Sequence, residues 1–406
     1  MAGMKYWLWL SALTGVSARA KLALAEHYGG AEQAYFAPPG EYASLDGVSA
    51  VDAERLESRL LPDTDAILRD CDRQGLRILT LTDAAYPARL RNSPDAPVVL
   101  YLRGRLPDVD SLPSVAVIGT RKASYYGRSA GGKLAYELCQ CGGVLVSGLS
   151  PGVDETAARA AITADGRCIG VLGTPHELCS GGLYDDILQR GALVSEYPPG
   201  ARTRRSFFRE RNRICYGLAA AVVVVEAGMD SNALRFASEA GHRGRVIFAV
   251  PGNIDSPLSE GTNDMLRHGA AIALCGWDIM ERLQAEFPGK ITDAVSVPYP
   301  APPDTEKAEA PSVPTETAET EAAPSGTVGK PPKPSPKRSA KAAPVLPEGL
   351  TEQQRRIVEV IAPEGTELDC LPDQLDIDVA ELMSELSFLE ILGVLRVSDT
   401  GKVTRT

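Results

Sequence analysis

The most chemically distinctive stretch of the sequence is the segment 202–213, which holds six arginines and one glutamate in twelve residues. Arginine pairs bidentately with phosphate, and Phe207 and Phe208 supply ring faces on which unpaired bases stack. A duplex hides its base faces, so charge beside exposed aromatic rings is typical of single-strand binding. The segment therefore predicts a site for single-stranded DNA. The alternative is the start of an amphipathic helix with buried phenylalanines and arginines in ion pairs; both hold if one phenylalanine is buried and the other exposed.

This positive charge is local. The whole chain of 406 residues has a formal net charge of −11, and residues 114–290 contain 19 basic against 18 acidic side chains. That balance argues against a general attraction to nucleic acid, because such attraction comes from an excess of basic residues. Affinity for DNA would have to come from a few well-placed arginines.

A second candidate site is the loop 119–127, which follows an apolar run. A glycine at a strand end lets the backbone approach an anion, and the N-terminus of the next helix adds partial positive charge. The loop is neither a GxGxxG nor a Walker A sequence, so neither a dinucleotide nor a triphosphate is specifically indicated. Phosphate contacts would come from Gly119, Thr120, Arg121, Lys122 and Ser124.

Two more loops follow apolar runs and are expected at the same edge. Gly148 belongs to a small-residue stretch that keeps this edge open, and Asp154 is expected to cap the next helix, with a catalytic carboxylate as the alternative. Ser231 and Asn232 stand at a helix start and can donate to phosphate, although a plain N-cap explains Ser231 nearly as well.

Apolar runs alternating with helical patterns set the expected fold. Continuous apolar strands of this kind belong to a mostly parallel sheet covered on both faces, a Rossmann-like α/β core over residues 114–290. Right-handed crossovers place the loops after the strands along one edge, where such folds bind ligands. The runs are 115–118, 143–146, 168–172, 192–194, 221–225 and 246–250.

Three further segments flank this core. Residues 1–113 predict a helical domain whose two Leu-x-Gly-Val turns resemble helix-hairpin-helix (SAM-like) units; a helical packing module without a ligand is an equal alternative. Residues 291–349 hold 13 of the 30 prolines and predict a disordered linker. Residues 350–406 predict a winged helix, with a helix after Thr351, a second after Asp378 and a closing hairpin.

Cofactors, metals and membranes are not indicated. The eight cysteines form no CxxC pair, which favours free thiols in a reducing cytoplasm and predicts no metal site. No stretch reaches the roughly 20 apolar residues that cross a bilayer. The apolar N-terminus breaks at Ser11 and predicts a buried helix rather than a signal peptide.

The motifs together resemble those of the DNA-processing protein A (DprA, or Smf) family. They follow one another in order over about 150 residues, and the flanking domains agree with its longer members. The motif residues are Gly119-Thr120-Arg121-Lys122-Ala123, Ser147-Gly148-Leu149, Gly152-Val153-Asp154, Ser195-Glu196-Tyr197-Pro198-Pro199-Gly200, Arg211-Asn212-Arg213-Ile214, Val224-Val225-Glu226-Ala227, Pro251-Gly252-Asn253, Gly261-Thr262-Asn263 and Gly269-Ala270.

The resemblance implies a cytoplasmic protein that binds single-stranded DNA, protects strands taken up in natural transformation and loads the RecA recombinase on them. It also implies a homodimer formed through the Rossmann-like core. It assigns strand contacts to Thr120, Arg121, Arg205, Phe208 as the stacking aromatic, Arg211, Asn212 and Arg213. With the residues above, the expected DNA contacts are Gly119, Thr120, Arg121, Lys122, Ser124, Gly148, Arg204, Arg205, Phe208, Arg211, Asn212, Arg213, Ser231 and Asn232.

Three departures from the family pattern bear on function. Pro151 stands where relatives often have arginine or another residue, Ala158 replaces a common histidine, and Asn232 and Phe236 replace a glycine and a threonine. Loss of the histidine removes the general base that a reaction in the pocket would need and favours a protein without catalytic activity. Two alternatives are a nucleotide-phosphate-processing enzyme on a related fold, whose usual Pro-Gly-Gly-x-Gly-Thr loop is missing here, and a scaffold that binds only proteins.

The C-terminal segment has the wrong charge for a DNA reader. Residues 350–406 contain 5 basic and 12 acidic side chains, whereas a DNA-binding winged helix needs a basic surface. We therefore expect this domain to contact protein or to occlude the basic groove by mimicking DNA charge. Deletion of residues 350–406 without any change in DNA affinity or partner binding would exclude both roles.

Overall fold

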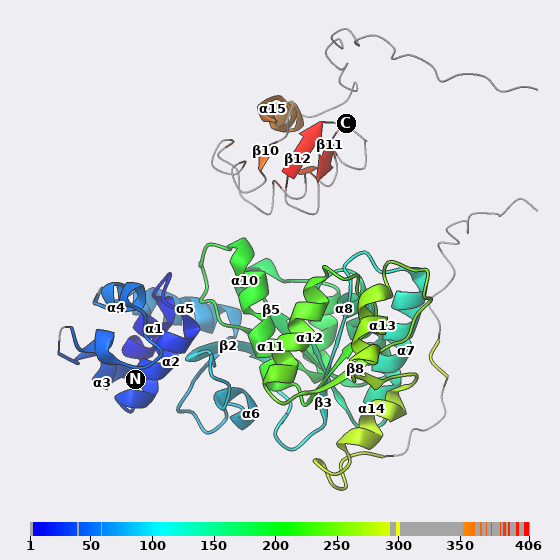
Figure 1. Ribbon diagram of the computed structural model, residues 1–406. Helices are drawn as coiled ribbons and strands as arrows, with labels where there is room; N and C mark the ends of the chain where they lie inside the picture. The colour runs from blue at the N-terminus through cyan, green and yellow to red at the C-terminus, as the bar shows by residue number, and fades with distance from the viewer. Residues whose placement is uncertain are drawn as a thin grey trace, which may run out of the picture. The chain divides into compact units, whose positions relative to one another are not determined.

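The protein is described by a computed structural model (Figure 1). The structure describes residues 3–292 except 39 and 58, residues 298–300, residues 352–361, and part of the remaining chain between 366 and 405. The described chain divides into two compact units, Met1–Ala308 and Glu309–Thr406.

The chain begins with short helices. Ser17 caps α2 and Ser49 caps α4, each by accepting a backbone N–H with its hydroxyl oxygen. Asp52 joins the two Leu-x-Gly-Val turns, because it accepts the Ser17 N–H at 2.8 Å and the Ser49 hydroxyl at 2.8 Å. The Ser17 N–H, at the end of the first of these turns, is therefore already bonded within the protein. The helices are α1 (Met4–Ala12), α2 (Ala18–His27), α3 (Ala31–Tyr35), α4 (Ala50–Leu56) and α5 (Thr64–Gln74).

A nine-stranded sheet forms the centre of the first unit, in the order β1-β2-β6-β5-β4-β3-β7-β8-β9. The neighbours from β6 through β9 pair in parallel, whereas β2 pairs antiparallel with both β1 and β6. The expected mostly parallel α/β sheet is confirmed. Its strands are β1 (Arg77–Thr80), β2 (Val99–Gly104), β3 (Ser114–Ile118), β4 (Val144–Ser147), β5 (Arg167–Leu172), β6 (Ala192–Ser195), β7 (Ala221–Val224), β8 (Val246–Ala249) and β9 (Ala271–Ile272).

Helices cover both faces of this sheet (Figure 1). Alternate strand residues point to opposite faces: Val115 and Val117 belong to a buried cluster with residues of α7, α8, α9 and α14, whereas Ala116 and Ile118 belong to a second one with residues of α11 and α12. The central strands are fully buried, which explains their unbroken apolar sequence. The helices are α6 (Ala88–Arg91), α7 (Tyr125–Gln140), α8 (Val153–Thr163), α9 (Leu183–Arg190), α10 (Arg205–Glu210), α11 (Asn212–Leu218), α12 (Asn232–His242), α13 (Glu260–Arg267) and α14 (Gly276–Leu283).

The sheet extends beyond the segment expected to contain it. Strands β1 and β2 lie before residue 113, inside the segment expected to be wholly helical, and β2 pairs directly with β6. The run of consecutive helices in that segment therefore ends with α5, and the short helix α6 lies between β1 and β2. Tyr299, within the expected linker, packs its ring against Tyr136 of α7 at a centroid distance of 5.5 Å; most of the linker lies outside the described residues.

The second unit contains α15 (Glu352–Val360) and a small antiparallel sheet in the order β10-β12-β11. The predicted closing hairpin is present, since β11 (Leu395–Val397) pairs with β12 (Lys402–Arg405); β10 is Thr366–Glu367. Most of the helix expected after Asp378 lies outside the described residues. The winged-helix assignment remains a prediction.

Candidate nucleic-acid interface

The arginine-rich segment folds as two consecutive short helices, α10 and α11, joined at Arg211. Its arginines separate into two groups. The first four, Arg202, Arg204, Arg205 and Arg209, are exposed. The last two, Arg211 and Arg213, are buried to 4% and 7% exposure. The basic surface is therefore built by the exposed group alone.

The two phenylalanines of α10 have different environments. The Phe207 ring stacks on the Tyr197 ring, with centroids 3.7 Å apart and planes inclined by 10°. Tyr197 is itself buried, and its hydroxyl donates to Glu210 at 3.2 Å. Phe208 is 47% exposed, in the middle of the exposed arginines. Phe208 is therefore the ring available to a base.

Arg211 holds the sheet edge together from inside. Its guanidinium donates to the Val171 carbonyl at 2.8 Å, to the Ser150 hydroxyl at 2.8 Å and to the Gly148 carbonyl. A side chain at position 148 would overlap that guanidinium, so glycine is required for its approach. Arg211 and Gly148 thus position the loop after β4, and we do not carry them into the proposed DNA contacts.

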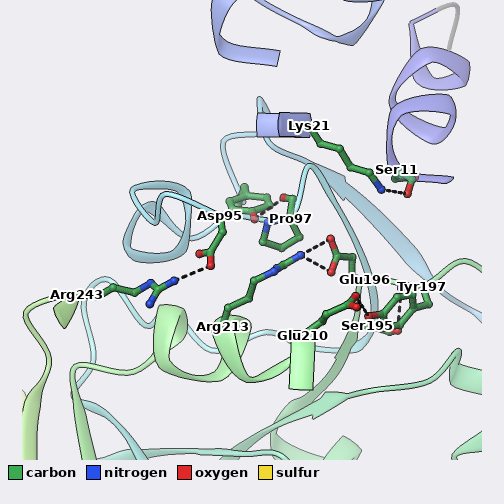
Figure 2. A network of polar contacts seen from close by, with 11 residues as sticks. Ser11, Lys21, Asp95, Pro97, Ser195, Glu196, Tyr197, Glu210, Arg213 and Arg243 are labelled. Carbon is green, nitrogen blue, oxygen red and sulfur yellow. Dashed lines mark hydrogen bonds and ion pairs between the residues drawn. The ribbon is translucent and has the colours of Figure 1, made fainter. Parts of the chain in front are cut away.

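Arg213 lies in a buried charge network (Figure 2). Its guanidinium bonds both carboxylate oxygens of Glu196, at 2.6 and 2.5 Å. Burial lowers the pKa of Arg213, but the facing carboxylate more than offsets this and holds the pKa above its ordinary value. Lys21 of α2 is buried nearby and donates to the Ser11 carbonyl at 2.8 Å. Arg213 therefore forms a buried ion pair with Glu196 and does not face solvent.

The loop after β3 presents its cations outward. Arg121 and Lys122 are exposed, and Thr120 is half-buried. The Thr120 hydroxyl accepts the Lys122 N–H at 3.3 Å, and its own proton has no acceptor among the described residues. The assignment of these three residues as phosphate contacts remains a prediction.

Ser124 faces an anion of the protein itself. Its N–H donates to the Glu226 carboxylate at 2.9 Å, and its hydroxyl donates to the other carboxylate oxygen. The same hydroxyl oxygen accepts the Gly127 N–H at 3.0 Å and so caps α7. A side chain at Gly127 would overlap Glu226. The anion position at the start of α7 is thus filled by Glu226, so Ser124 is not carried into the phosphate contacts.

The remaining candidates stand at helix starts. Asp154 was expected to cap α8, but it lies inside the first turn of that helix. Burial raises the pKa of Asp154 to about 6, and Arg211 and backbone N–H groups oppose the rise. Ser231 caps α12 by accepting the Ala233 N–H at 3.2 Å. Asn232 is exposed beside it, and Asn212 is half-buried with its side-chain oxygen accepting from Arg211.

Three residues without an assigned role in the sequence belong to this edge. Arg209 is exposed four residues after Arg205, on the same helix face. Tyr126 and Glu226 line a cavity of about 450 Å³ next to the loop after β3. The four-residue spacing of Arg205 and Arg209 could have indicated in the sequence that they share a helix face. The sequence gives no such indication of the cavity, because its lining joins segments 100 or more residues apart.

Neither a metal site nor a membrane-spanning helix is found among the residues that the structure describes. There, no group of three or more histidine, cysteine or acidic side chains is placed to hold a metal ion. Within the same residues, no helix is both long and apolar enough to cross a bilayer.

Comparison with known proteins decides the family. The profile of the family described as DNA recombination-mediator protein A matches residues 77–284, from the first residue of β1 to the residue after α14. The chain belongs to this family. The resemblance drawn from the motifs is thereby confirmed, and the chain has a role in DNA processing as a recombination mediator.

Individual relatives agree with this assignment. Protein Smf of Synechocystis is 30% identical over 400 residues, which is 96% of each chain. DNA processing protein DprA of Bacillus subtilis is 31% identical over 252 residues, covering 61% of this chain and 84% of the relative. The X-ray structure of DprA from Streptococcus pneumoniae superposes with a TM-score of 0.58 at 30% identity, covering 68% of this chain and 97% of that one.

Proposed function

We propose that the protein binds single-stranded DNA along the carboxyl edge of its parallel sheet. The observation that carries the proposal is the exposed Phe208 among Arg204, Arg205 and Arg209. Cations hold the phosphates, and the ring stacks on an unpaired base. Arg121, Lys122 and Thr120 supply the second set of phosphate contacts. Gly119, Asn212, Ser231 and Asn232 remain proposed contacts of the same edge.

The proposed biological role is protection of incoming strands and loading of RecA on them during natural transformation. Membership of the recombination-mediator family supports this role. We propose that no catalytic turnover is involved. Asp154, the carboxylate weighed as a catalytic group, is buried and accepts backbone N–H groups of Gly119 and Ser150, which supports a structural role for it. A RecA-loading assay on coated single strands tests the role directly.

We further propose a cytoplasmic homodimer formed through the core. The seven cysteines among the described residues are free thiols, which supports a reducing compartment. Strand β9 forms one edge of the sheet among the described residues. Ile272 in this strand is 50% exposed, and Leu274, just after it, is 61% exposed. An open edge with apolar side chains suits pairing with a second copy. Ile272→Arg should give a monomer in sedimentation; an unchanged dimer would exclude this surface.

The decisive experiment compares a dT oligonucleotide with a duplex of the same length, by gel shift at two salt concentrations. We expect tight binding of the single strand and weaker binding of the duplex, because Phe208 requires an exposed base face. Binding of the single strand should weaken as salt rises, since phosphate contacts release counterions. Equal affinity for both forms, or none for either, would overturn the proposal.

A further inference from the structure

A cavity opens beside the loop after β3. Its volume of about 450 Å³ lies within the roughly 300–1,000 Å³ typical of small-molecule sites. It lies where the strand order turns: β4, β5 and β6 follow β3 on one side, and β7 and β8 lie on the other. Such switch points are where open α/β sheets bind ligands. Its lining residues are Ser124, Tyr126, Glu226, Pro251, Gly252, Asn253, Ser256 and Ser259.

The charge of this lining argues against a phosphate. Glu226 alone is charged among the eight lining residues, and it is an anion. The donors nearest to it are already used, because Ser124 gives both its N–H and its hydroxyl proton to the Glu226 carboxylate. A phosphate here would meet a buried carboxylate without a compensating cation in the lining. The cavity therefore suits a neutral group that forms hydrogen bonds.

The rest of the lining suits a flat ring. Tyr126 is 47% exposed, and its hydroxyl donates to the Pro251 carbonyl at 2.6 Å, which fixes the ring at the cavity wall. Asn253 and Ser256 add side-chain donors and acceptors. Each oxygen of the Glu226 carboxylate keeps a further lone pair that can accept from an amino group. An aromatic wall with acceptors is the chemistry that recognises a nucleobase.

The neighbouring cations show where the phosphates of the same strand would lie. Arg121 and Lys122 are exposed and precede Ser124 by only two or three residues. We propose that the cavity takes one nucleobase of the bound strand, an amino-bearing base in preference to thymine, while Arg121 and Lys122 hold the flanking phosphates. This rests on the proposed binding of single-stranded DNA. It adds a second base contact, on the β7–β8 side of the sheet, to the one at Phe208.

The test compares a 20-nucleotide dC strand with a strand of equal length that carries abasic sites throughout. Tyr126→Ala should weaken binding of the dC strand by roughly fivefold to a hundredfold, the loss typical of one stacked base. It should leave binding of the abasic strand unchanged, because the phosphate contacts remain. Tyr126→Phe keeps the ring and should retain most of the affinity.

Tyr125→Ala is the matched control. Tyr125 is the neighbouring aromatic residue and is equally exposed, at 45%, but it does not line the cavity. Its substitution should leave the difference between dC and abasic strands intact. If Tyr126→Ala fails to fold, as judged by thermal melting, Ser256→Phe fills the cavity instead and should lower dC affinity in the same selective way.

The outcomes separate this inference from the function on which it rests. If the wild type binds neither strand, the proposed function and the base site both fail. If it binds the dC strand in a Phe208-dependent manner while Tyr126→Ala behaves as Tyr125→Ala does, the base site alone fails. A free deoxynucleoside is the other source of the same chemistry. Saturable deoxycytidine binding that needs Tyr126, with strand binding that does not, would overturn the assignment to the strand.

Discussion

Phe207 stacks face to face on Tyr197, and this contact fixes which way the next residue points. The two rings lie 3.7 Å apart at 10°, so Phe207 is anchored against the end of β6. Successive residues of a helix project about 100° apart, so Phe208 is turned away from this anchor and toward solvent. The same short helix thus joins a buried, structural ring to the exposed ring that we propose as a DNA contact.

Substitution of the two phenylalanines should separate stability from binding. Phe208→Ala should cost about 1–3 kcal/mol of single-strand affinity, the value of one stacked base, and leave the melting temperature nearly unchanged. Phe207→Ala should lower the melting temperature, because it removes a packed aromatic contact. Fluorescence anisotropy with a dT oligonucleotide and thermal melting measure the two effects. Unchanged affinity in Phe208→Ala would show that the stacking ring has been wrongly assigned.

The exposed arginines of α10 should control the salt dependence of binding. Each phosphate contact on a single strand contributes about 0.7 to the slope of log affinity against log salt. Arg205→Ala and Arg209→Ala should therefore each lower the magnitude of that slope by about 0.7. Arg73→Ala is the control, since Arg73 is exposed on α5 and pairs with Asp70 at 2.9 Å. A control with the same loss as the α10 variants would show that only general charge is measured.

The buried ion pair should contribute to stability rather than to DNA contact. Arg213→Ala leaves Glu196 buried without its partner and should cost about 3–5 kcal/mol of unfolding free energy. Arg243→Ala is the matched control, because its pair with Asp95 is about 20% exposed, at 21% and 22%, and should cost less. Urea unfolding measures both. If Arg213→Ala kept its stability but lost DNA binding, Arg213 would be a contact after all.

The sequence predicted the parallel sheet because each buried strand is an unbroken apolar run. The apolar run 98–102 has the same pattern and forms most of β2, but its place among helical turns favoured the helical domain expected for residues 1–113. Strand β9 has only two residues, too few to show a pattern. The burial of Arg211 and Arg213 could not be predicted. Their partners, the Val171 carbonyl and Glu196, stand 40 and 17 residues earlier in the chain, and only the fold brings them together.

Lys21 makes a prediction about pH. Burial lowers its pKa from 10.5 to about 8; Glu196 opposes this, Arg213 adds to it, and Glu210 and Asp52 oppose it. The unfolded lysine therefore binds its proton more tightly than the folded one does. Between about pH 8 and 10.5 the unfolded state holds more protons, so stability rises with pH over this window, by a few kcal/mol at most. Below pH 8 the lysine is charged in both states and its burial penalty is constant.

The difference in unfolding free energy between the wild type and Lys21→Met isolates this effect, because the other titrating groups are common to both proteins. We expect the wild type to gain stability relative to Lys21→Met as the pH rises from 7 to 10. Lys133→Met, at a half-exposed position that pairs with Glu137, controls for the loss of a lysine charge. Urea unfolding at several pH values measures the difference. A flat difference across the window would mean that Lys21 is solvated in the folded protein.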